Sequence, residues 1–129
     1  MKRKKRMQAL LVGVAAGALL VIAGSRIAPA QDAAQVNAKF VKVRLENPRV
    51  RVLESALEPG DKEQLHSHPA YVTYVVAGGK IRNHTADGKA TETELKTGDV
   101  LYRDAITHWA ENIGTTTIRV VLVELKSPS

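Results

Sequence analysis

From Phe40 onward the chain consists of short runs in which apolar and polar residues alternate, and most runs end in turn-forming residues. Alternation with a period of two is typical of β-strands that bury one face. The segments between runs carry glycine, proline and aspartate, for example at residues 58–61 and 86–89, and these residue types favour tight turns. No segment after Phe40 combines a helical period with helix-capping residues. The sequence therefore predicts an all-β fold of antiparallel strands.

The alternation divides this region into about nine strands, and strands of this length and spacing are typical of a β-sandwich or a β-barrel. We predict strands at residues 40–45, 50–57, 63–68, 72–77, 80–84, 91–95, 100–103, 107–112 and 116–125.

The first thirty residues have the features of an export signal. Positions 2–6 are all lysine or arginine, residues 9–24 are uncharged and mostly small or aliphatic, and residues 28–30 offer a small-x-small cleavage site. The apolar run is shorter than the roughly 20 residues that span a bilayer as a helix. We therefore expect 1–30 to be a cleaved signal peptide and the protein to be periplasmic or secreted. The alternative is a retained N-terminal membrane anchor. We expect 31–38 to be a linker and 39–126 the folded domain.

The formal net charge of +6 belongs to the N-terminal segment. Six of the nineteen basic residues precede Gln31, so the rest of the chain carries thirteen basic and thirteen acidic residues. A neutral domain lacks the basic surface that nucleic-acid binding requires. We therefore expect no nucleic-acid partner, and contact with a membrane only through the N-terminal segment if that segment is uncleaved.

The histidines carry the clearest chemical signal. His66 and His68 are two positions apart in a region that is predicted as strand, so both imidazoles would point to one side of a sheet. On a helix the same spacing would separate them by roughly 200°. His108 would arrive from a later strand. A metal site is one interpretation, and a pair of surface histidines in a loop before Pro69 is the other.

The turn and histidine pattern resembles the cupin superfamily. Its first motif is a glycine, five residues, His-x-His, three or four residues, a glutamate, six residues and a glycine. Gly60, the His66/His68 pair and Gly79 match this motif. The second motif runs from a glycine to a histidine and an asparagine, and residues 98–112 match it at both ends. The resemblance covers about residues 43–125. It implies a small double-stranded β-helix of the RmlC-like type, also called a jelly-roll barrel.

The chain departs from the family pattern at two places. Val72 stands at the glutamate position when three residues are counted after His68, and Asp104-Ala105-Ile106 replaces the Pro-x-Gly turn. The resemblance therefore implies a metal site of His66, His68 and His108 without the usual carboxylate.

Imidazole suits zinc, iron, copper and nickel, and manganese is a further candidate. Three protein ligands leave coordination positions open for water or substrate, and three neutral imidazoles leave the metal charge uncompensated. The expected guest is a small organic anion, such as a carboxylate with an adjacent hydroxyl or keto group.

Other residues are weaker candidates for contact with the metal or the guest: Gln64, which strand alternation places on the face of His66, Tyr74, Tyr102 and Asn112. Asn112 shares the face of His108 and is expected to tie strand ends together. Three side chains are expected elsewhere: Trp109 on the opposite face from His108, Glu111 away from the site, and His84 in solvent beside a hairpin. Asp104 is expected to cap a turn.

Three functions remain open at this point. The first is a metal-dependent enzyme such as a dioxygenase or an isomerase. The second is a non-catalytic binding or sensing protein, and the third is a metal-free structural barrel. Cupins commonly pair through edge strands, so a homodimer is also considered.

Overall fold

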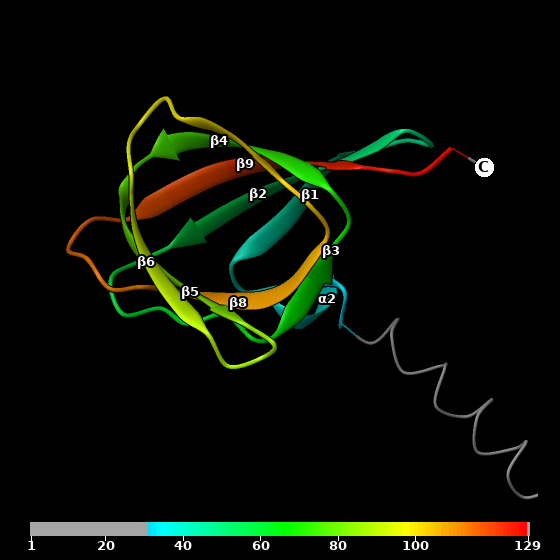
Figure 1. Ribbon diagram of the computed structural model, residues 1–129. Helices are drawn as coiled ribbons and strands as arrows, with labels where there is room; N and C mark the ends of the chain where they lie inside the picture. The colour runs from blue at the N-terminus through cyan, green and yellow to red at the C-terminus, as the bar shows by residue number, and fades with distance from the viewer. Residues whose placement is uncertain (1–30, 129) are drawn as a thin grey trace, which may run out of the picture. The chain divides into compact units, whose positions relative to one another are not determined.

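The structure is a computed structural model that describes residues 31–128, and these residues form a two-sheet barrel (Figure 1). One short helix, α2 (Ala33–Val36), precedes nine strands. The strands are β1 (Val41–Glu46), β2 (Val50–Leu57), β3 (His66–His68), β4 (Tyr71–Ala77), β5 (Gly79–Thr85), β6 (Ala90–Leu95), β7 (Val100–Arg103), β8 (Ile106–Asn112) and β9 (Ile118–Leu125). The prediction of an all-β jelly-roll fold is confirmed.

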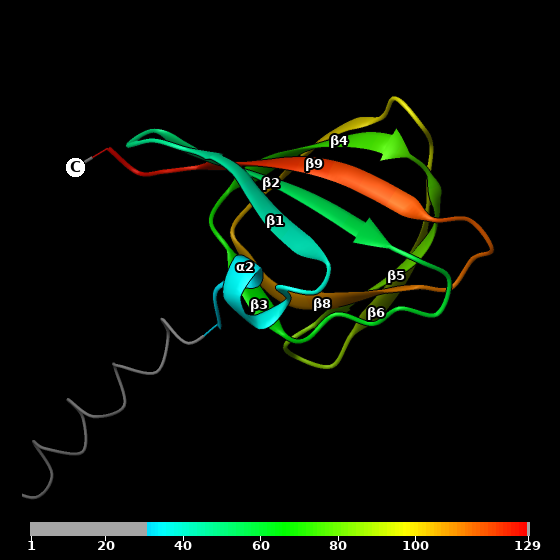
Figure 2. The same cartoon turned by 180° about the vertical axis from the view of Figure 1, so that it is seen from behind.

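The nine strands form two antiparallel sheets that face each other (Figures 1 and 2). The larger sheet has the order β1-β2-β9-β4-β7, and the smaller has the order β3-β8-β5-β6. Neighbours in space are mostly distant in sequence: β9 lies between β2 and β4, and β8 lies between β3 and β5. This topology brings side chains from distant parts of the chain into one interior.

Alternating burial along the strands builds that interior. On β4, Tyr71, Thr73 and Val75 are buried, whereas the residues between them face outward. Apolar side chains from both sheets then pack in two clusters, one around Leu53 and one around Val75. Leu53 and Val75 are fully buried, and burial of a leucine side chain contributes roughly 1.5–3 kcal/mol to folding.

The segment 31–38, which was predicted as a linker, is instead packed against the barrel. Asp32 caps α2 by accepting a hydrogen bond from the backbone N–H of Gln35. Ala33 and Asn37 are 1% and 2% exposed, and Asp32 forms an ion pair with Arg51 on β2. Four helical residues are too few for a periodic signal, so only tertiary contacts reveal this element.

The predicted signal peptide, residues 1–30, lies outside the described residues. Within 31–128 no helix has both the length and the apolar character that crossing a bilayer demands.

Candidate metal site

Strand pairing brings three histidines together inside the barrel. His66 and His68 occupy the two inward positions of β3, and His66 is directly opposite His108 in the pairing of β3 with β8. The three side chains are 1%, 7% and 8% exposed. Their ring centroids are 4.7–5.4 Å apart, and one nitrogen from each ring lies within 4.8 Å of the other two. The predicted convergence of the three imidazoles is therefore present.

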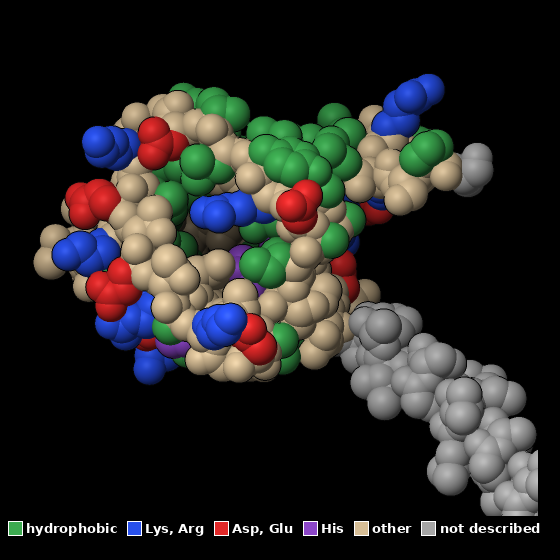
Figure 3. All heavy atoms as spheres, viewed as in Figure 1, with side chains coloured by type: hydrophobic (Ala, Val, Ile, Leu, Met, Phe, Trp, Pro, Cys, Tyr) green, Lys and Arg blue, Asp and Glu red, His purple; other side chains and the backbone are tan. Residues whose placement is uncertain are grey.

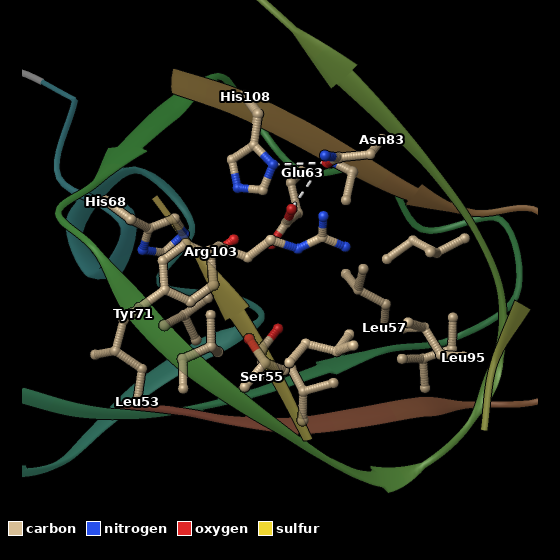
Figure 4. Close-up of a pocket in the computed structure, with 18 of the residues that line it drawn as sticks. Leu53, Ser55, Leu57, Glu63, His68, Tyr71, Asn83, Leu95, Arg103 and His108 are labelled. Carbon is tan, nitrogen blue, oxygen red and sulfur yellow. Dashed lines mark hydrogen bonds between the residues drawn. The ribbon is translucent and has the colours of Figure 1, made fainter. Parts of the chain in front are cut away.

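Each imidazole is oriented by an acceptor at its Nδ1 atom. His66 Nδ1 lies 2.7 Å from the backbone carbonyl of Gln64, His68 Nδ1 lies 2.6 Å from a carboxylate oxygen of Glu124, and His108 Nδ1 lies 2.6 Å from Oδ1 of Asn83 (Figure 4). The partners of His68 and His108 only accept, so Nδ1 carries the proton in these two rings. His66 Nδ1 also lies 2.9 Å from the amide nitrogen of Asn37, but its contact with the Gln64 carbonyl is shorter, and we assign its proton to that contact. The Nε2 atoms are left with free lone pairs, which is the arrangement that a metal-binding histidine needs.

The Nε2 atom of His108 has no hydrogen-bond partner although it is buried, and it is the single such side-chain atom in the described part of the chain. A buried polar atom without a partner costs roughly 1–3 kcal/mol. Burial and the nearby His66 and His68 rings lower the pKa of His108 to about 3, and burial likewise lowers the pKa of His66. The rings of His66 and His108 therefore stay neutral and able to bind a cation at neutral pH. The residues present fit a divalent metal.

Three charged side chains, Glu124, Arg51 and Asp32, form a row of ion pairs that begins at Nδ1 of His68. Burial acts to raise the pKa of Glu124, but hydrogen bonds from His68 and Arg51 outweigh it and hold that pKa below its usual range. Arg51 Nε lies 2.7 Å from Glu124 Oε1, and Arg51 Nη2 lies 2.6 Å from Asp32 Oδ1. The ionised carboxylate of Glu124 increases the electron density on the His68 ring and makes it a better metal ligand.

The histidines form one wall of a cavity of about 110 Å³ (Figure 4). Figure 3 shows its mouth as a hollow with a basic side chain at the rim and histidine atoms inside. The polar wall comes from β3, β5, β7, β8 and the segment before β3. The opposite wall is apolar and consists mainly of leucine, isoleucine and valine side chains from β2, β6 and β9.

Glu63 faces the cavity, and Gln64 does not. Strand alternation from His66 predicted the reverse, but β3 begins only at His66. Lys62 bridges to Glu111, whereas His66 pairs with His108, so the register shifts by one residue between these two pairs. The Gln64 side chain is exposed, and Gln64 contributes to the site only through its backbone carbonyl, which accepts from His66.

Glu63 is held in the cavity by a hydrogen bond: the backbone N–H of Ala110 donates to its carboxylate at 3.0 Å. Burial raises the pKa of Glu63 to about 7.

Arg103, the last residue of β7, is an exposed residue of the cavity lining, and its guanidinium lies over the cavity in Figure 4. Within residues 31–128 it forms no ion pair and no side-chain hydrogen bond. Sequence reasoning overlooked Arg103, Glu63, Asn83 and Glu124 as members of this site.

Tyr74 and Tyr102, which were considered as contacts of the guest, lie on the outer surface. They are 47% and 61% exposed. The tyrosine at the cavity is Tyr71, which is 5% exposed and packs against His68 with a ring-centroid distance of 4.8 Å. Thr73 on the same strand lines the cavity, and Val72 faces outward. The inward position nearest the family's glutamate is therefore a threonine.

Asn112 is buried and ties loops together. Its Nδ2 donates to the carbonyl groups of Leu57 and Thr116, and its Oδ1 accepts from the backbone N–H of Gly114. It has no hydrogen bond to the histidines, so the structure supports the expected tying role and not a role beside the metal.

The outer face of the smaller sheet carries the remaining residues. Trp109 faces away from His108, as expected, and stacks on His84 with a ring-centroid distance of 3.7 Å. His84 Nε2 lies 2.9 Å from Glu111, which also pairs with Arg82. The prediction that His84 is solvated is wrong, because its side chain is only 20% exposed. Asp104 is exposed beside β7.

Comparison with known proteins agrees with this geometry. Residues 53–124 match the family model described as Cupin domain. A solved cupin domain from Bordetella pertussis is 27% identical, with a TM-score of 0.63 over 68% of this chain and 93% of that one.

A double-stranded β-helix protein from Klebsiella pneumoniae is 26% identical, with a TM-score of 0.52 over 65% of this chain and 73% of that one. A Thermotoga maritima protein described as a predicted oxalate decarboxylase is 22% identical, with a TM-score of 0.51 over 67% and 79% of the two chains, and this likeness concerns the fold alone. No curated protein matches the chain.

Proposed function

The chain belongs to the cupin family, and from that premise we propose that it binds one divalent metal through His66, His68 and His108 and holds a small organic anion beside it. The observation that carries this proposal is the orientation of the three imidazoles. Each Nδ1 is committed to an acceptor, and the Nε2 of His108 is buried without a partner. A barrel that binds no metal would not be stabilised by this arrangement, and the buried Nε2 atom without a partner would destabilise it.

The donor set narrows the choice of metal without fixing it. Three neutral imidazoles suit zinc, iron, copper and nickel, and manganese is also compatible with imidazole ligands. When bound, such an ion would act as a Lewis acid toward an oxygen of the guest and supply open coordination positions.

Glu63 favours an enzyme among the functional alternatives. Its carboxyl lies in the same cavity as the histidines and Arg103, and burial raises its pKa to about 7. A carboxyl that titrates near neutral pH can both donate and accept a proton, which is what general acid–base catalysis requires. We propose that Glu63 exchanges a proton with the guest, as in an isomerase-type reaction. Dioxygenase chemistry would need iron and remains the competing enzymatic proposal.

A non-catalytic binding protein is the second candidate. Thr73 occupies the inward position nearest the glutamate of the family motif, so the ligand set lacks a carboxylate. Turnover of a small organic acid by the metal-loaded protein would exclude this candidate.

Metal analysis of protein purified without a histidine tag tests the proposal. We expect about one equivalent of a divalent metal in the wild-type protein and a large loss in the double variant His66→Ala/His68→Ala. The matched control is His84→Gln, because His84 lies outside the cavity, and it should retain the metal. Equal metal content in the wild type and the double variant would overturn the proposal.

We further propose that the protein is exported and that cleavage occurs after Ala30. The basic positions 2–6 and the apolar run 9–24 support this. Mass spectrometry of protein recovered from the periplasm or medium should find a chain that begins at Gln31. An intact chain in the membrane fraction would favour the anchor instead.

A further inference from the structure

We infer that the guest is a short-chain monocarboxylic acid, with its carboxylate at Arg103 and the histidine cluster and its hydrocarbon part against the apolar wall. This inference rests on the proposed function, because it names the class of anion that the same site would hold. Three features of the cavity carry it: an unpaired cation, a small volume and a mainly apolar wall that carries no charged side chain.

The unpaired cation is Arg103. Its guanidinium lies over the cavity, and none of the ion pairs within residues 31–128 includes it. Glu63, the acidic side chain of the cavity lining, forms no ion pair with Arg103 within these residues. A guanidinium presents a planar fork of donors that matches a carboxylate. The site therefore provides one place for one anionic group.

The volume limits the size of the guest. A dry cavity of about 150 Å³ is known to hold benzene, which has six non-hydrogen atoms. The present cavity, of about 110 Å³, therefore fits a guest of about six non-hydrogen atoms or fewer. Propionate and butyrate meet this limit. Sugars, aromatic acids and long-chain acids do not.

The mainly apolar wall disfavours a second charged group at the far end of the guest. Leu57 and Leu95 lie across the cavity from His108 (Figure 4), and Leu53, Ile118 and Leu122 extend the same surface. The polar side chains that the strands of this wall add to the lining are the hydroxyls of Ser55 and Thr93, and they cannot neutralise a charge. A charged end would therefore lose its hydration there without gaining an ionic partner. Dicarboxylates and inorganic phosphate should therefore bind more weakly than a monocarboxylate of matching length.

The test uses the full domain loaded with zinc, with zinc content measured in every sample. Isothermal titration is carried out with acetate, propionate, butyrate and hexanoate, and with butyramide, succinate and inorganic phosphate. We expect affinity to rise from acetate to propionate or butyrate and to fall at hexanoate. Butyramide, succinate and phosphate should each bind at least about tenfold more weakly than butyrate, because each lacks the single charge or the apolar end.

Arg103→Met should weaken butyrate binding by about tenfold or more, since a charge-assisted hydrogen bond is lost. Arg44→Met is the matched control, because Arg44 pairs with Glu54 at an exposed site, and it should leave the affinity unchanged. Both variants should keep their zinc.

Equal affinity of the wild type and Arg103→Met, or affinity that is flat across the acid series, would overturn the inference while leaving the metal proposal intact. Tighter binding of succinate or phosphate would also overturn it. Loss of zinc from the wild-type protein would instead contradict the proposed function.

Discussion

Asn37 Nδ2 lies 2.9 Å from Nδ1 of His66, although the two residues are 29 positions apart. Asn37 is 2% exposed, and its side chain forms hydrogen bonds with both the backbone N–H and the backbone carbonyl of Gln64. Its Nδ2 donates to the Gln64 carbonyl at 3.1 Å, and its Oδ1 accepts from the Gln64 N–H at 2.7 Å. That carbonyl is the acceptor of His66 Nδ1. The segment before β1 thus fixes the orientation of one candidate metal ligand.

Asn37→Ala should therefore weaken metal binding. Loss of an outer partner of a metal-bound histidine costs about 10–100-fold in affinity, and we expect an effect in this range from competition titration with a chelator. Gln35→Ala in α2, the helix that Asn37 caps at its C-terminal end, is the control, because Gln35 is exposed. An unchanged metal affinity in Asn37→Ala would show that the Gln64 carbonyl is positioned without it.

Glu124→Gln should weaken metal binding and stability together. The variant keeps the shape of the side chain but removes the charge that faces His68 and Arg51. Arg51, whose side chain is 15% exposed, would keep only Asp32 as a partner. Breaking a buried ion pair typically costs about 3–5 kcal/mol. Chemical denaturation and metal titration measure the two effects. Glu46→Gln is the control, because it removes only an exposed ion pair with Lys126. It should change neither the metal affinity nor the free energy of unfolding strongly.

Glu63 makes the stability of the metal-free protein depend on pH. Its pKa rises from an ordinary value of 4.5 to about 7 on folding, because burial disfavours the charged form. The folded state therefore binds more protons between these values, and the free energy of unfolding falls as pH rises through this window. The full effect is on the order of 3 kcal/mol. Glu63→Gln should remove this contribution.

Denaturation of chelator-treated protein at several pH values measures the contribution of Glu63. We expect Glu63→Gln and the wild type to differ little below about pH 4.5 and most above about pH 7. A constant difference between them across this range would mean that the carboxyl is not buried in the folded state.

Leu53→Ala should destabilise the barrel through its core. Leu53 is fully buried in the cluster that includes Val41, Tyr71 and Leu122, and truncation of a buried leucine costs about 2–5 kcal/mol. Leu125 is 39% exposed, so Leu125→Ala should lower the free energy of unfolding much less. Urea denaturation curves of the two variants compare them directly, and similar midpoints would contradict this view of the core.

The strands were predictable because alternation and turn residues act locally. Every predicted strand from residues 40 to 125 has a counterpart, and most boundaries agree to within two residues. The histidine cluster followed from the same rule, since the spacing of His66 and His68 determines their common face. His108 needed the family resemblance to be assigned to the same site.

The rest of the site depends on contacts that local patterns do not contain. The shift in register between Lys62 and His66 reversed the expected roles of Glu63 and Gln64. On β4 each face carries apolar residues and one tyrosine, so alternation alone does not tell which face is inward. Tyr74, a candidate contact of the guest, lies on the outer face. Arg103 and Glu124 reach the site only through the order of strands in the larger sheet.

The stacking of Trp109 on His84 provides an optical probe within the molecule. Trp109 is the only tryptophan of the chain, and it lies on β8 next to His108 but on the opposite face of the sheet. Its emission can thus follow the integrity of the ligand-bearing strand while a guest in the cavity never touches the fluorophore. Spectral changes on adding metal would then report a movement of β8 itself.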